Sequence, residues 1–136
     1  MDGITLTPLK QILHPKGDIF HAMKASDNGF SGFGEAYITT IIKGEIKGWK
    51  MHTMMTMNIV VPLGMVRFYI YDEVKNNTVT YEIGVMNYQR LTIPSGYWVA
   101  FEGLISEQNL VLNIANIEHD PSESNNVPLE TYPLGV

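Results

Sequence analysis

The stretch of sequence that decides the fold is GEIKGWKMHTMMTMNIVVPLGMVRFYIYD, residues 44–72. It places one histidine, His52, ahead of an apolar β-rich run that is broken at Pro62-Leu63-Gly64. From Met65 to Tyr71, the apolar side chains of Val66, Phe68 and Ile70 recur at every second position, with Arg67 and Tyr69 between them. This alternation indicates a β-strand, because successive side chains of a strand point to opposite faces. The segment therefore predicts a succession of short strands with one histidine among them.

The same pattern of short strands and turns extends over most of the chain. The stretch LTIPSGYWVAFEGL, residues 91–104, indicates a strand, a turn at Pro94-Ser95-Gly96 and a second strand. No segment has helical periodicity, and close spacing of short strands is typical of a sandwich or barrel. The sequence therefore predicts an all-β fold, with further strands at residues 4–13, 19–24, 36–42, 46–54, 78–85, 88–93, 98–104 and 110–117.

Length, charge and composition restrict the class of protein. The chain has 136 residues, a net charge of −5 and no cysteine. We expect one barrel domain at residues 1–120, followed by an extended arm or a partly disordered tail at residues 121–136. The negative charge opposes binding to nucleic acid or to anionic membranes. The lack of cysteine excludes disulfides and thiolate metal sites.

Signals for targeting and for membrane insertion are not found. The N-terminal stretch MDGITLTPLKQILHPKGDIF has no apolar core of a signal peptide. No apolar run approaches the roughly 20 residues that span a bilayer. We therefore expect a soluble, cytoplasmic protein.

The candidate site residues cluster around the histidine. Lys47, Trp49, Lys50 and His52 fall within six residues, so an imidazole base, two cations and a stacking surface lie on one strand. The lysines are equally typical of a solvated edge strand, and the tryptophan of a core. Three further residues are candidates for binding a substrate, although periodicity does not decide whether they face inward: Arg67, Tyr69 and Tyr97.

A metal site is not expected. The other histidines are scattered along the chain, and methionines rather than further histidines follow His52. Thioethers are poor ligands for hard cations. The sequence predicts neither a metal nor another cofactor.

The ordered motifs IKGWKMH, PLG, MVRFYIYD, LTIPSGYW, LNI and DP, after a start like HPKGDIFHAMKASD, resemble a known family. The resemblance spans residues 4–125 and is to the cupin-type dTDP-4-dehydrorhamnose 3,5-epimerases and their shorter relatives. It implies a cupin-type β-jelly roll, a double-stranded β-helix barrel, that pairs into a homodimer by strand exchange. It also implies a nucleotide-linked 4-keto sugar as the ligand, and no cofactor.

The resemblance assigns roles to some residues of this chain, while other residues of the family's site have no counterpart here. His52 falls where the family has its catalytic base, and Lys47 matches a basic residue that helps to bind the ligand's phosphates. Val99 replaces a second histidine of the family, and no tyrosine matches the family's proton donor near residues 116–119. Other tyrosines substitute for that donor if they point inward: Tyr37, Tyr69 or Tyr97.

Three functions are compatible with these residues. The first is an epimerase or isomerase that removes a proton next to the C4 ketone of a dTDP-linked 4-keto-6-deoxy sugar, with His52 as the base. The second is a catalytically inactive cupin that binds a sugar nucleotide or another small anion. The third is a structural dimeric module. We favour the first because the base motif keeps its basic neighbours.

Overall fold

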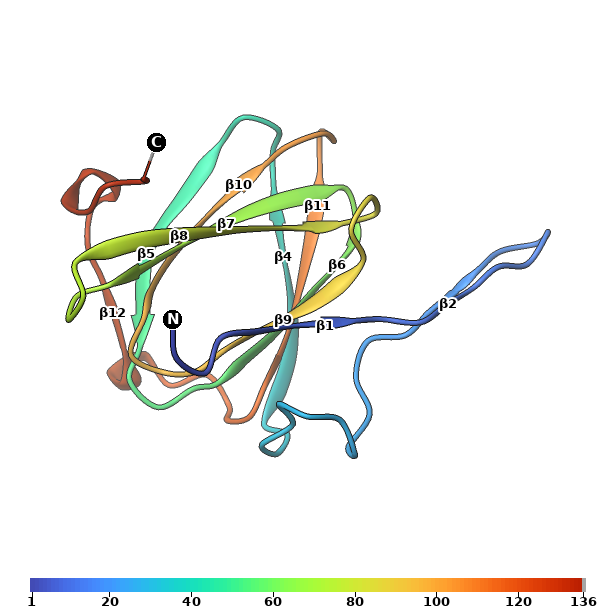
Figure 1. Ribbon diagram of the computed structural model, residues 1–136, viewed down its shortest axis with the longest axis horizontal. Helices are drawn as coiled ribbons and strands as arrows, with labels where there is room; N and C mark the ends of the chain where they lie inside the picture. The colour runs from blue at the N-terminus through green and yellow to red at the C-terminus, as the bar shows by residue number, and fades with distance from the viewer. Residues whose placement is uncertain (136) are drawn as a thin grey trace.

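The computed structural model describes residues 1–135 and consists of two five-stranded antiparallel sheets packed face to face (Figure 1). The first sheet has the order β1-β9-β6-β11-β4, and the second sheet has the order β12-β5-β10-β7-β8. A two-stranded hairpin, β2–β3, projects from the barrel as an arm (Figure 1). The strands are β1 (Thr5–Pro8), β2 (Gln11–Ile12), β3 (Ile19–Phe20), β4 (Glu35–Ile41), β5 (Ile46–His52), β6 (Met57–Leu63), β7 (Met65–Asp72), β8 (Asn77–Gly84), β9 (Gln89–Ile93), β10 (Trp98–Gly103), β11 (Asn109–Ala115) and β12 (Ser124–Asn126). Two short 3-10 helices, η1 (Pro121–Glu123) and η2 (Leu129–Thr131), flank β12.

The expected all-β fold is confirmed, and so is the alternation along β7. Val66, Phe68 and Ile70 belong to the core between the sheets, whereas Tyr69 and Tyr71 belong to a cluster on the other face. The core takes residues from both sheets: Ile41, Ile59, Val61, Val66, Phe68, Ile70, Ile83, Leu91, Ile93, Val99 and Val111. This apolar contact between the two sheets holds them together.

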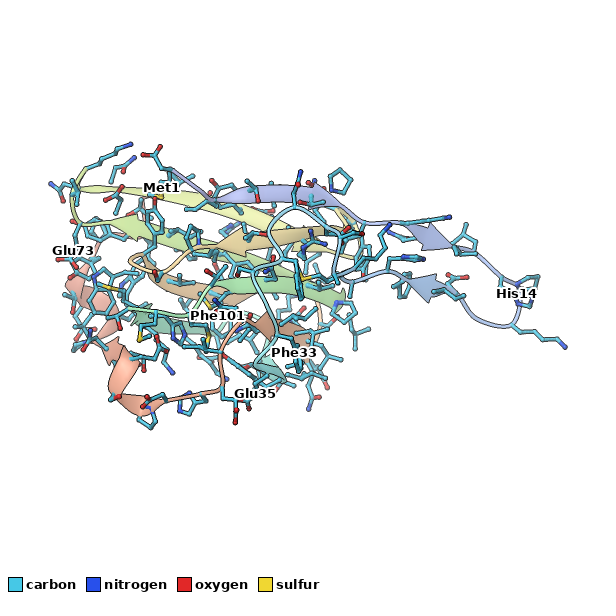
Figure 2. The ribbon with its side chains drawn as sticks, turned by 90° about the horizontal axis from the view of Figure 1, so that it is seen from below. Met1, His14, Phe33, Glu35, Glu73 and Phe101 are labelled. Carbon is cyan, nitrogen blue, oxygen red and sulfur yellow. The ribbon has the colours of Figure 1, made fainter. Side chains whose placement is uncertain are left out.

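The N-terminal strand is shorter than expected. The single strand predicted at residues 4–13 is wrong, because β1 pairs with β9 only from Thr5 to Pro8. The chain then leaves the barrel and pairs instead with its own return strand, so Gln11 lies opposite Phe20. Figure 2 shows His14 at the far end of this arm. Within residues 1–135, no helix has the length and hydropathy needed to cross a membrane.

Aromatic side chains on the outer face of the second sheet form a separate cluster. This outer aromatic cluster consists of Trp49, Tyr69, Tyr71 and Trp98 together with Ala100. The C-terminal segment, residues 121–135, runs across it and contributes part of its packing. Thus β5 contacts the C-terminal segment, and one face of β5, which carries Ile46, Trp49 and Met51, packs in the same cluster as that segment.

Candidate functional site

A cavity of about 300 Å³ lies between the sheets, where β4 of the first sheet faces β5 and β12 of the second. Its lining is mainly apolar and includes a few polar and charged side chains. The lining residues are Tyr37, Thr39, Lys47, Gly48, Trp49, Lys50, His52, Met57, Ile59, Phe68, Val99, Phe101, Val111, Asn113 and Asn126. A concave apolar site with a few convergent polar groups is the usual setting for a small-molecule ligand.

An irregularity in β5 brings the charged residues of that strand to the same cavity. Along the β5–β10 pair, Val99 lies opposite Lys50 and Phe101 lies opposite Lys47, so β5 has one more residue than β10 over this interval. Such a bulge resets the alternation of side chains along a strand. Because of it, Lys47, Lys50 and His52 all line the cavity.

Glycine at position 48 makes this arrangement possible. A Cβ atom at Gly48 would lie 2.3 Å from the Cβ of Ala100 on the neighbouring strand. That separation is far below van der Waals contact, so a larger residue at position 48 would push the two strands apart. The small pair of Gly48 and Ala100 therefore permits the close approach of β5 and β10 at the bulge.

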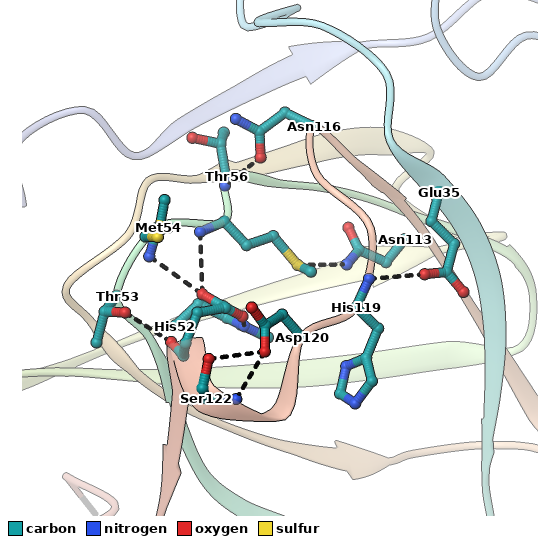
Figure 3. Close-up of polar contacts among 12 residues, drawn as sticks. Glu35, His52, Thr53, Met54, Thr56, Asn113, Asn116, His119, Asp120 and Ser122 are labelled. Atoms are coloured by element: carbon teal, nitrogen blue, oxygen red, sulfur yellow. Dashed lines mark hydrogen bonds and ion pairs between the residues drawn. The ribbon is translucent and has the colours of Figure 1, made fainter.

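His52 is held by a carboxylate from a distant part of the chain (Figure 3). Its Nδ1 lies 2.5 Å from Oε1 of Glu123, and the side chains of both residues are almost fully buried. The other carboxylate oxygen, Oε2, accepts hydrogen bonds from the backbone N–H groups of Met54 and Met55 at 3.1 and 3.2 Å. With Nδ1 engaged, Nε2 is the imidazole nitrogen left for a ligand.

Local structure fixes the position of this carboxylate. Asp120 caps η1, because its side chain accepts hydrogen bonds from the backbone N–H and the hydroxyl of Ser122 at 2.9 and 2.7 Å. Those bonds hold the pKa of Asp120 below its usual value. Thr53 then bonds the carbonyl of Glu123 through both its N–H and its hydroxyl, each at 2.7 Å. The turn is therefore fixed on both sides of Glu123.

The ionisation of Glu123 reflects two opposed effects. Burial raises the pKa of the Glu123 carboxyl, but its hydrogen bonds with His52 and with the N–H groups of Met54 and Met55 outweigh burial and lower the pKa below its usual 4.5. The carboxylate form therefore predominates near neutral pH. It can orient the imidazole and stabilise its protonated form.

This lowered pKa predicts a pH dependence of stability. A carboxyl whose pKa is lower in the folded state stabilises the protein above the unfolded-state pKa and loses that contribution as the pH falls through the folded-state pKa. We expect Glu123→Gln to lower the free energy of unfolding by about 2 kcal/mol near pH 7. We expect this difference to shrink as the pH drops below about 4. Urea unfolding of both proteins across this range measures it, and a difference that stays constant with pH would contradict the prediction.

On the opposite sheet, Tyr37 brings a phenol to the same cavity. Its hydroxyl accepts a hydrogen bond from Nδ2 of Asn113 at 3.0 Å and lies 4.0 Å from the sulfur of Met55. Met55 also donates its backbone N–H to Glu123. One residue therefore contacts both Tyr37 and the carboxylate partner of His52, which places the phenol close to the imidazole–carboxylate pair.

The sequence-predicted site residues divide into two groups. His52, Lys47, Lys50 and Trp49 line the cavity. The indole of Trp49, however, packs in the outer aromatic cluster and donates its Nε1–H to the carbonyl of Leu129 at 2.8 Å. The amine of Lys47 reaches the carbonyl of Thr40 on β4 at 2.8 Å and so bridges the two sheets beside the cavity.

Arg67, Tyr69 and Tyr97 are not among the residues that line the cavity. Arg67 bonds Glu82 at 2.8 Å, and the Tyr69 hydroxyl donates to Glu102 at 2.7 Å, in an ion-pair network on β7, β8 and β10. Tyr97 donates its hydroxyl to the carbonyl of Asp2. Of the three tyrosines considered as proton donors, Tyr37 is the one among the residues that line the cavity.

Sequence reasoning missed Glu123, Asn113 and Asn126. Glu123 lies 71 positions from His52, so no local spacing could have joined the two residues. Asn113 has a weak signal, because it falls on the same face of β11 as the core residue Val111. Among residues 1–135, no three His, Asp or Glu side chains are grouped in a way that could hold a metal ion.

The fold and the site together define an all-β jelly roll of the cupin type, with a cavity between its sheets and a buried imidazole–carboxylate pair. Solved structures with the same fold include a dTDP sugar isomerase from Desulfovibrio desulfuricans G20, with 29% identity, a TM-score of 0.91, and coverage of 96% of this chain and 87% of that chain. They also include a dTDP-6-deoxy-D-glucose-3,5-epimerase from Legionella pneumophila in complex with dTDP-4-keto-L-rhamnose, with 16% identity, a TM-score of 0.83, and coverage of 99% and 81%. A dTDP-4-dehydrorhamnose 3,5-epimerase from Sulfolobus tokodaii has 20% identity, a TM-score of 0.82, and coverage of 96% and 80%.

No protein-family model and no curated protein sequence matches the chain. The resemblance to the cupin-type dTDP-4-dehydrorhamnose 3,5-epimerases, expected from the order of the sequence motifs, is confirmed by these structures.

Proposed function

We propose that this chain is a sugar-nucleotide epimerase or isomerase that removes a proton next to the C4 ketone of a dTDP-linked 4-keto-6-deoxy sugar. The observation that carries the proposal is the buried pair of His52 and Glu123 at a cavity that also holds two lysines and one tyrosine. The similarity to a dTDP sugar isomerase and to 3,5-epimerases supports the same class of reaction.

His52 acts as the base. The carboxylate of Glu123 engages Nδ1, so Nε2 is free to take a proton from the carbon next to the ketone. The electron pair of the broken C–H bond moves to the carbonyl oxygen, which gives an enolate. The imidazolium that forms is stabilised by the adjacent carboxylate.

Tyr37 acts as the proton donor. It lies on β4 of the first sheet, whereas His52 lies on β5 of the second, so the two groups approach a bound ligand from different walls of the cavity. A proton delivered to the same carbon from the face opposite the base inverts the configuration. The phenolate then takes a proton from water and the imidazolium releases one, which restores both groups.

The two lysines bind the anionic part of the ligand. The net charge of −5 repels an anion at long range, so a local positive field is needed to hold a diphosphate. Lys47 and Lys50 line the cavity and supply that field, and they also favour the negative charge that develops on the enolate oxygen.

Incubation with a panel of dTDP-linked 4-keto-6-deoxy sugars in deuterium oxide tests the proposal. Followed by NMR, the reaction is expected to place deuterium at C3 or C5, and the labelled carbon names the reaction. A carbonyl that moves along the ring would instead identify an isomerase. If no member of the panel exchanges but the panel raises the melting temperature, the chain is an inactive binding protein. If neither occurs, the structural-module alternative stands.

We further propose that the chain forms a homodimer through the β2–β3 arm. The arm extends from the barrel (Figure 2). It exposes apolar side chains, with Leu13 76% and Ile19 57% accessible. Exposed apolar side chains on a projecting hairpin are typical of an element that packs on another subunit. Sedimentation is expected to give twice the chain mass of 15.3 kDa, and a monomer would contradict this proposal.

A further inference from the structure

We infer that Tyr132 is a positioning residue: its docking on the outer aromatic cluster holds the C-terminal segment in the place that brings Glu123 to His52 and Asn126 to the cavity. This inference rests on the proposed role of His52. It concerns a side chain on the outer face of the second sheet, which is not among the residues that line the cavity.

The Tyr132 ring sits among three aromatic rings of the cluster. It stacks on Tyr71 with ring centroids 4.2 Å apart and an interplanar angle of 20°. It also contacts Trp98 at 5.4 Å and meets Trp49 edge-on at 6.0 Å. Aromatic pairs in these geometries attract beyond simple area burial. Tyr132 is therefore the most extensively stacked side chain of the C-terminal segment.

Hydrogen bonds fasten the same segment on either side of this ring. Trp49 exchanges two backbone hydrogen bonds with Val127, at 3.1 and 3.2 Å, and donates its indole N–H to the carbonyl of Leu129. At the far end, the hydroxyl of Thr78 donates to the carbonyl of Pro133 at 2.6 Å. The segment is thus attached to β5 and β8 along its length.

The inner end of this segment belongs to the site. In β12, Ser124 pairs with His52 and Asn126 pairs with Lys50, so the strand extends the second sheet at the edge of the cavity. Glu123 lies directly before β12 and Asn126 lines the cavity. Strand β5 therefore contacts the outer aromatic cluster through Trp49 and Met51 on one face, and the cavity through Lys50 and His52 on the other.

This arrangement links docking of the segment to the protonation pattern of the imidazole. A carboxylate at Nδ1 keeps the proton on that nitrogen and leaves Nε2 as the base. Undocking that extends through β12 to η1 breaks the bonds of Glu123 with Thr53, Met54 and Met55 and takes the carboxylate away from Nδ1. The neutral imidazole is then free to carry its proton on Nε2, and that nitrogen can no longer act as the base. A segment undocked for about nine-tenths of the time would lower kcat about tenfold.

Tyr132→Ala tests the inference, with Tyr132→Phe as the matched control because phenylalanine keeps the ring. Three quantities are compared with the unsubstituted protein: amide hydrogen exchange across residues 121–135, the 15N shifts of the His52 ring nitrogens, and kcat. We expect the alanine variant to show faster exchange in the segment, movement of the His52 proton from Nδ1 to Nε2, and a fall in kcat of about tenfold. We expect the phenylalanine variant to keep all three.

The ring-nitrogen shifts need no substrate, so they separate this inference from the proposed function. If Tyr132→Ala unfolds the barrel, which exchange in β7 and β10 would report, Leu134→Ala provides a milder loss of packing in the same segment. A segment that undocks while His52 keeps its proton on Nδ1 would overturn the inference. A segment that stays docked in both alanine variants would overturn it as well.

Discussion

Replacement of His52 by alanine is expected to lower the rate of deuterium incorporation into the ketosugar by roughly 10²–10⁴-fold, the range for loss of a general base. The reason is that His52 combines burial, a carboxylate partner 2.5 Å from Nδ1 and a place on the cavity wall. Alanine leaves the cavity larger and keeps Lys47 and Lys50, so binding of dTDP is expected to persist. The measurement is NMR in deuterium oxide, with calorimetry for dTDP.

His119→Ala is the matched control for this loss. His119 is exposed and is not among the residues that line the cavity, and its backbone N–H rather than its ring bonds Glu35. His119→Ala is expected to leave the rate of deuterium incorporation into the ketosugar unchanged. Exchange that survives in His52→Ala, with the panel still bound, would remove His52 from the role of base.

Under the proposed mechanism, replacement of Tyr37 by phenylalanine is expected to separate proton removal from inversion of the configuration. His52 still removes the proton and can return it, or deuterium from the solvent, to the same face of the enolate. Deuterium therefore still enters the substrate, while formation of the inverted product falls by roughly 10²–10⁴-fold. One NMR experiment that follows label and configuration measures both quantities.

Tyr81→Phe removes the same hydroxyl group from a tyrosine of β8 that packs against the core and is not among the lining residues. Both label and product are expected to be unchanged in this control. If Tyr37→Phe forms the inverted product at the normal rate, the proton comes from another group. If it loses exchange and inversion together, Tyr37 acts in binding or in enolate formation rather than as the donor.

The features of this molecule that the sequence predicts are those set by residues close together in the chain. The two faces of β7 are correct because alternation is a local property of a strand. The same alternation holds whichever face is inward, so it could not show that Arg67 and Tyr69 lie outside the cavity.

The candidate site was only partly predictable for a related reason. His52 and the two lysines lie on one strand and were identified together. Strict alternation, however, would put Lys47 and Lys50 on opposite faces, and only pairing with β10 reveals the bulge that brings them together. Glu123 reaches His52 through tertiary structure alone, since 71 positions separate them. The local sequence around Asp120-Pro121 does not indicate that Glu123 binds the imidazole of His52.

The bulge in β5 has a consequence for how a ligand lies. Lys47 lies near the start of β5, Lys50 lies between it and His52, and His52 ends the strand, so two cations precede the base along one side of the cavity. An elongated molecule with anionic groups at one end and a ketone at the other is complementary to this gradient in one direction only. The reversed molecule would place its anionic groups away from Lys47, so the order of these three side chains along one strand favours one orientation of the ligand.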